Sequence, residues 1–151
     1  MQIWGLDVNP DCLLCTSFPE SASHLFFECQ FSSAVWLAFF NHAVLSPPTD
    51  FNGVRNWLHS PFPNAKLRVI CYLVFQAVIY FLWRERNGRL HGTAPLQPVA
   101  LVKQIKIMLR AKMAALDKCH RSALITSYRQ PNPSSSIAGE SFIYRWFEYF
   151  G

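Results

Sequence analysis

Residues 12–29 read CLLCTSFPESASHLFFEC and hold four side chains of the types that bind zinc: Cys12, Cys15, His24 and Cys29. Structural zinc sites are closed tetrahedra of thiolate and imidazole ligands, and a two-residue spacer lets both thiolates of a tight turn face one ion. The four-residue spacer after His24 lets the second pair reach the same ion from a short turn or helix start. The spacing therefore predicts a zinc knuckle with a complete ligand set.

The alternative interpretation is a redox-active or idle pair of thiols. A redox Cys-x-x-Cys normally opens a helix after a strand, whereas Ser17, Pro19 and Glu20 follow this pair and indicate a loop. The chain has five cysteines, an odd number that disfavours a disulfide framework. Cys71 and Cys119 lie in apolar helical runs, so we expect both to be small core residues.

The charges are divided unevenly along the 151 residues. No Lys or Arg occurs in residues 1–54, which carry five acidic residues, whereas residues 55–129 hold thirteen basic and two acidic ones. The knuckle is therefore acidic, and any attraction for phosphate must come from the later helices. With 51% hydrophobic residues and 15% aromatic ones, the chain also has ample material for a core.

Apolar periodicity and breakers predict helices after the knuckle. Ser32 or Ser33 can cap the first, Pro47 ends it, and a short helix follows at residues 51–58. A long helix should run from an Asn64 cap to about Leu90, and another from about Gln97 to Leu124. We therefore expect a mainly α fold with a zinc-knuckle region (1–46), a helical region with a basic face (51–126), a flexible linker (127–140) and an aromatic C-terminal helical segment (141–151).

The long helix contains an almost unbroken apolar run at residues 69–83. This run is interrupted by Gln76 and is shorter than the roughly 18–20 residues that span a bilayer. Both of its flanks are basic, so it gives no orientation signal. The pattern favours a buried core helix, with a membrane span as the less favoured alternative.

The next helix separates into two faces. An apolar stripe runs along Val102, Ile105, Leu109, Met113, Leu116 and Cys119. A neighbouring face carries Lys103, Lys106, Arg110, Asp117 and Arg121. Its four cations are our candidate phosphate contacts, although a merely solvated face is an equal alternative. The aromatic side chains of the C-terminal segment should pack either on the core or on a partner.

The longer pattern W-G-L-D-V-x3-C-L-L-C-x8-H-L-F-F-E-C-x-F-S-x3-W, from Trp4 to Trp36, resembles the reverse-transcriptase zinc-binding domain of plant non-LTR (LINE-type) retrotransposons. Residues 83–87, WRERN, resemble the W-x-x-R-N pattern that often closes the long helix after such knuckles. In those elements the domain follows a polymerase, so the resemblance implies an association with nucleic acid. No polymerase motif is present, and we expect an N-terminally truncated fragment.

Catalysis is not expected. A four-ligand site leaves no position for water, the remaining histidines are scattered, and the basic half lacks the clustered carboxylates of a two-metal nuclease. We expect a non-catalytic zinc module that assists binding of RNA or DNA through its basic helices, inside the cell, in nucleus or cytoplasm. The alternative is a protein-interaction remnant that packed on a polymerase domain; a membrane partner is the least favoured.

Overall fold

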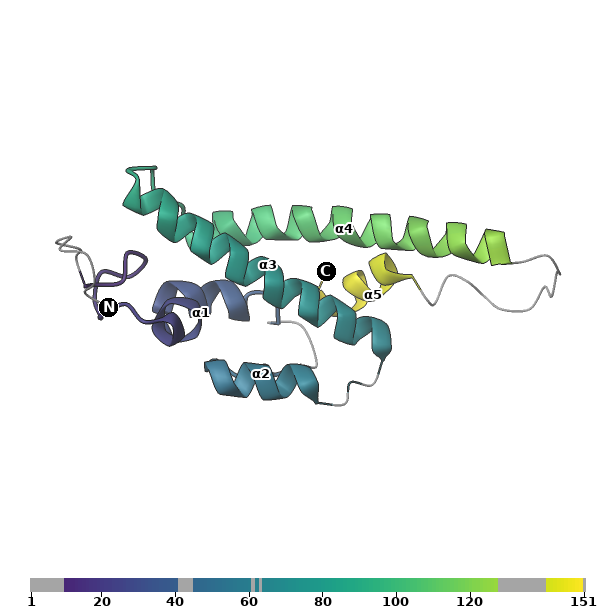
Figure 1. Cartoon of the computed structure of the whole chain (residues 1–151), viewed down its shortest axis with the longest axis horizontal. Coiled ribbons are helices and arrows are strands. Elements are labelled where there is room, and N and C mark those ends of the chain that lie inside the picture. The colour runs from purple at the N-terminus through teal and green to yellow at the C-terminus, as the bar shows by residue number, and fades with distance from the viewer. Residues whose placement is uncertain (1–9, 41–44, 61, 63, 128–140, 151) are drawn as a thin grey trace.

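The computed structural model describes residues 10–40, 45–60, 62, 64–127 and 141–150, and within them the chain is mainly helical. A loop leads into a π-helix and five α-helices (Figure 1): η1 (His24–Glu28), α1 (Gln30–Leu37), α2 (Phe51–His59), α3 (Ala65–Leu90), α4 (Pro98–Ser127) and α5 (Phe142–Phe150). In this part of the chain the only β-type pairing is an isolated bridge between Asp11 and Pro19. The predicted mainly α fold, with helices following the Cys/His cluster, is confirmed.

Helix α3 is the centre of the molecule. It contacts α1, α2, α4 and α5, and Figure 1 shows it running diagonally between α4 and α2. The predicted cap is present, since the Asn64 side chain accepts hydrogen bonds from the backbone N–H groups of Lys66 and Leu67 at 2.7 and 3.3 Å. One face is buried at three- and four-residue steps, through Leu67, Ile70, Val74, Val78 and Leu82 among others.

The C-terminal end of α3 is fixed by a Schellman motif. Gly92 has a φ of 78°, in the left-handed region where glycine is favoured. The N–H of Thr93 then donates to the Gly88 carbonyl at 2.8 Å, and the N–H of Gly92 donates to the Arg89 carbonyl at 3.2 Å. The helix therefore ends where the sequence predicts, and the chain turns into α4.

By length and composition alone, α3 is also the one helix of the described residues that could cross a membrane, and 44% of its apolar window is buried inside the fold. The buried part faces the other helices of the bundle. The outer face keeps Val69, Tyr80 and Trp83 exposed. In this fold α3 is thus a core helix with one solvent-facing apolar side.

The C-terminal helix α5 packs on the core of its own chain, against α3 and α4. Trp146 and Phe150 are 0% and 2% exposed. The Trp146 ring contacts Phe39 at 6.5 Å between centroids, and Phe150 contacts Phe40 at 5.5 Å. The sequence left open whether this segment packs on the core or on a partner. In the structure α5 packs on the core of its own chain.

Asp117 does not belong to a solvated face of α4. It is 7% exposed and caps the N-terminus of α5: Oδ1 accepts from the Phe142 N–H at 2.7 Å, and Oδ2 accepts from the Ile143 N–H at 3.0 Å and the Ser141 hydroxyl at 2.7 Å. Burial alone would raise the pKa of this carboxyl, but these hydrogen bonds outweigh it and lower the pKa. The apolar periodicity of α4 could not reveal that Asp117 caps a different helix, α5.

Three other local expectations need correction. Helix α1 begins at Gln30, with Cys29 as its N-cap, rather than after Ser32 or Ser33. Ser32 is instead buried, and its hydroxyl donates to the Leu25 carbonyl at 2.5 Å. Cys71 is in the core as expected, whereas Cys119 is exposed, because it lies about 200° around α4 from the buried Asp117. Helix α4 also continues to Ser127, the first residue of the expected linker.

We predict that Asp117→Ala lowers the free energy of unfolding by about 1–3 kcal/mol, because three donors at the start of α5 lose a charged acceptor. The depressed pKa means that this contribution is present above the ordinary carboxyl pKa of about 4 and is lost as the pH falls through the lower folded-state value. Urea unfolding at pH 7 and at pH 3 measures both effects. The neighbouring Lys118→Ala, at an exposed site, is the control, and equal stability of wild type and Asp117→Ala at pH 7 would contradict the capping role.

Candidate metal centre

The loop that carries Cys12 and Cys15 is closed on itself by backbone hydrogen bonds. The N–H of Thr16 donates to the Cys12 carbonyl at 2.7 Å, and the N–H of Cys12 donates to the Phe18 carbonyl at 2.8 Å. Thr16 has a φ of 55°, a left-handed conformation that turns the chain directly after the second cysteine. Both thiols are thereby held on the inside of one tight turn.

A π-helical turn positions the other two ligands. In an α-helix, positions five residues apart differ by roughly 140° in direction, so His24 and Cys29 would point apart. Here the N–H of Cys29 donates to the His24 carbonyl at 2.7 Å, the i to i+5 bond of a π-turn, which brings the two positions towards one side. The four-residue spacer therefore brings His24 and Cys29 to one side through a π-turn, which is wider than a turn of α-helix.

The four ligand atoms lie within 4.8 Å of one another. The Sγ atoms of Cys12 and Cys29 are 3.9 Å apart, and Sγ of Cys15 is 3.3 Å from Nε2 of His24. A tetrahedral zinc ion, with Zn–S of about 2.3 Å and Zn–N of about 2.05 Å, requires ligand separations of about 3.8 Å for two sulfurs and about 3.6 Å for sulfur and nitrogen. The residues present therefore fit a zinc ion, whose binding would supply a structural cross-link.

Burial and hydrogen bonding set the protonation of the thiols. Cys12 and Cys29 are fully buried, His24 is 8% exposed and Cys15 is half-buried. Burial raises the pKa of Cys12 to about 11. At Cys15 burial acts in the same direction, but hydrogen bonds involving the Ser17 backbone and the His24 side chain outweigh it and lower the pKa to about 7. A metal that binds at neutral pH must displace the Cys12 proton, so its affinity falls with falling pH.

The metal loop is fastened to α3 by an ion pair. Glu20, at the end of the loop, accepts hydrogen bonds from Arg86: Nε donates to Oε2 at 3.2 Å and Nη2 donates to Oε1 at 2.9 Å. Both side chains are about one-fifth exposed, and the two-pronged geometry is the stronger form of the Arg–carboxylate contact. This contact gives Arg86, the arginine next to Asn87 in the WRERN stretch, a structural role.

Arg89 makes the second connection, directly to the backbone of the Cys-x-x-Cys turn. Its Nη1 donates to the carbonyl oxygens of Leu13 and Leu14 at 3.1 and 3.0 Å, and its Nη2 donates to the Leu96 carbonyl at 3.1 Å. Its Nε pairs with Glu85 at 2.9 Å, and the same Glu85 oxygen accepts from the Leu96 N–H at 2.9 Å. One guanidinium thus joins the metal turn, α3 and the segment before α4.

Sequence reasoning missed this role of Glu85 and Arg89. Their i, i+4 spacing is the signal for a mutual ion pair, but the contacts to Leu13, Leu14 and Leu96 are set by tertiary packing. The Phe31 ring, which lies under the Arg89 guanidinium at 4.8 Å, completes the surroundings.

The predicted phosphate contacts all lie on α4, away from the metal ligands. Lys103, Arg110 and Arg121 are exposed, and Lys106 is half-buried. The Lys106 ammonium donates to the Phe150 carbonyl at 3.2 Å, and the Arg110 guanidinium lies over the Phe147 ring at 5.3 Å. Two of the four cations therefore already contact α5.

We predict that Cys29→Ser and treatment of the wild type with a chelator each unfold residues 10–40. Structural zinc supplies on the order of 10–16 kcal/mol in small zinc-finger peptides, about the total stability of a domain. Native mass spectrometry should find one zinc ion per wild-type chain and none in Cys29→Ser, and circular dichroism should show the loss of helix. The exposed Cys119→Ser variant is the matched control and should keep the ion; a metal-free chain that melts cooperatively would contradict the prediction.

We predict that Arg89→Ala lowers the free energy of unfolding by about 2–3 kcal/mol, because the buried Glu85 carboxylate loses its cation and three carbonyl groups lose their donor. Zinc affinity should fall by about tenfold in a competition assay with a chelating dye, since the turn between the thiols loses its support. Arg68→Ala, at an exposed site on the same helix, is the control. Unchanged zinc affinity in Arg89→Ala would show that the turn does not depend on α3.

Comparison with known proteins gives one finding. A family model described as zinc-binding in reverse transcriptase matches residues 1–36. No curated protein and no solved structure matches the chain. The matched segment contains all four residues of the metal cluster and ends at Trp36 in α1, so helices α2–α5 lie outside it. The first 36 residues are thus similar to a zinc-binding region of reverse transcriptases, and the geometry of their Cys/His cluster agrees with that description.

Proposed function

We propose that this chain is a non-catalytic zinc-stabilised module, derived from a LINE-type retrotransposon reverse transcriptase, that assists nucleic-acid binding through α4. The observation that carries the proposal is the charge of the α4 surface. Asp117 is the only acidic residue in α4, and it is buried under α5, so the exposed charged side chains of the helix are all cations. A helix surface whose exposed charges are all positive is the electrostatic footprint of phosphate binding.

The dimensions of this surface suit a polyanion. Lys103 and Arg121 are eighteen residues apart, which is five full helical turns and about 27 Å, so both project in nearly the same direction. Nucleic-acid strands place one phosphate every 3.4 Å or so along a duplex axis. Several phosphates can therefore lie along this face of α4 at once, with Lys118 at its side, about 60° from Lys103 around the helix.

The metal site supports this function by holding the fold together. All four ligands come from the protein, so a bound ion keeps no position for a reacting water. The knuckle has no Lys or Arg of its own, and Arg86 and Arg89 are used internally to hold it. Contact with phosphate is therefore assigned to α4 rather than to the knuckle.

The second candidate function is docking on a protein such as a polymerase domain. One observation favours it: the groove between η1 and α3 is lined by Phe26, Phe75, Ile79 and Trp83, with no charged residue. Dependence on salt separates the two candidates, because apolar docking does not weaken as the salt concentration rises.

We predict that the zinc-loaded chain binds a fluorescent oligonucleotide with an affinity that falls about 50- to 150-fold between 50 and 200 mM salt, as expected for about four phosphate contacts. The double variant Lys103→Ala/Arg121→Ala should roughly halve the slope of log affinity against log salt. The control double variant, Arg55→Ala/Arg68→Ala, removes exposed cations outside α4 and should leave most of the slope unchanged. Fluorescence anisotropy measures both, and binding that is insensitive to salt would favour protein docking instead.

A further inference from the structure

Two aromatic side chains on α3 are exposed at the surface of the fold, although the Tyr80 ring packs edge-on against Phe81 at 5.5 Å between centroids. Tyr80 and Trp83 are 53% and 52% exposed. Other aromatic residues nearby are used in the core, as Phe75 is against Phe27 and Trp36. Among the described residues, Trp83 belongs to no aromatic pair. Half-exposed rings of this size are enriched where a ligand or partner covers them.

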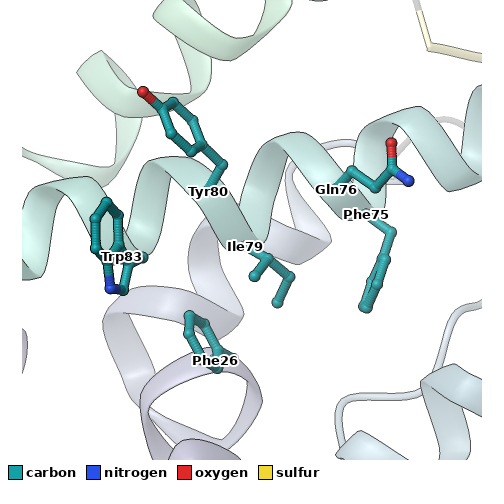
Figure 2. Close-up of a pocket in the computed structure, with 6 residues that line it drawn as sticks. All are labelled: Phe26, Phe75, Gln76, Ile79, Tyr80 and Trp83. Atoms are coloured by element: carbon teal, nitrogen blue, oxygen red, sulfur yellow. The ribbon is translucent and has the colours of Figure 1, made fainter.

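These side chains line a groove that consists of two adjacent hollows, one on each side of Gln76 and Tyr80. The first, of about 380 Å³, lies between η1 and α3 (Figure 2) and is walled by Phe26, Ile79 and Trp83. The second, of about 510 Å³, lies between α3 and α4. Gln76 and Tyr80 line both parts, and Figure 2 shows the Tyr80 ring pointing toward the neighbouring helix while Trp83 lies over the Phe26 side.

The second part of the groove is cationic. Arg84 and Lys112 line it, and no carboxylate lines either part. The Arg84 guanidinium is fixed in place, since it lies over the Phe81 ring at 4.2 Å and donates to Gln104 at 2.6 Å. Lys112 belongs to α4 and lies nine residues after Lys103, so it projects into the groove from the side of that helix about 180° away from Lys103 and Arg121. An occupant of this groove must therefore combine flat apolar groups with negative charge.

We propose that the groove binds single-stranded nucleic acid, with unstacked bases on the rings of Trp83 and Tyr80 and the adjacent phosphates at Arg84 and Lys112. This inference rests on the proposed nucleic-acid function and narrows it from any polyanion to a single strand. Bases paired within a duplex cannot present their faces to a side chain, whereas a single strand can splay them onto aromatic rings flanked by cations. Gln76, about one helical turn before Tyr80, supplies an amide that can hydrogen-bond a base edge.

The test compares a twelve-nucleotide oligo-dT with a twelve-base-pair duplex of mixed sequence, by fluorescence anisotropy with the full zinc-loaded chain at about 100 mM salt. The single strand should bind at least about tenfold more tightly than the duplex. Trp83→Ala should weaken binding of the single strand about tenfold and leave the duplex affinity unchanged. Trp83→Phe should keep most of the affinity, because it keeps a ring face.

Tyr144→Ala removes an equally exposed ring, 54% exposed on α5, outside the groove, and is the matched control. Circular dichroism melting curves establish that each variant is folded. If the single strand binds with a steep dependence on salt but Trp83→Ala and Tyr144→Ala behave alike, the groove proposal is overturned and the α4 proposal stands. If neither nucleic acid binds, both proposals fall and the groove is left as a protein-docking surface.

Discussion

The contacts of Arg89 with the carbonyl oxygens of Leu13 and Leu14 are the constraint on which the arrangement of this molecule depends. A metal turn of a dozen residues buries too little apolar surface to fix its own orientation. Here the turn is oriented by the Arg89 guanidinium, which is held in place by its ion pair with Glu85. At the other end of the same loop, Arg86 forms an ion pair with Glu20. The loop that carries the Cys/His cluster is therefore attached to the helical bundle at the C-terminal end of α3.

This arrangement also separates the carboxylates that are paired within the protein from the exposed cations of α4. Three of its acidic residues are placed where they bond to the protein itself: Glu20 with Arg86, Glu85 with Arg89, and Asp117 with the start of α5. Their negative charges are compensated locally and do not offset the cations on the outside of α4. The net charge of +5 thus understates how positive that surface is, because Asp117, the single carboxylate of α4, is buried under α5.

The parts of the structure that local sequence determines could be predicted. The cap at Asn64 and the stop at Gly92 follow from residue types that act on their own backbone, and so α3 was predicted within a residue or two. The cluster of Cys12, Cys15, His24 and Cys29 was visible because zinc imposes a spacing on its ligands. Asp117, Arg89 and the exposed Cys119 could not be assigned, because each depends on which element lies opposite in space. The π-turn at His24 was also hidden, since apolar periodicity does not distinguish it from the start of an α-helix.

The metal site and the aromatic groove share parts of the fold, so on the proposal above the metal would affect a ligand that it does not touch. Phe26, one wall of the groove, lies in the π-turn between His24 and Cys29. Trp83, the opposite wall, is three residues before Arg86, about one helical turn from the ion pair that docks the loop. Release of the metal would free the π-turn that carries Phe26, while Trp83 and the cations of α4 would stay on their own helices. Zinc would then govern the fit of bases in the groove, whereas attraction of phosphate to α4 would persist without it.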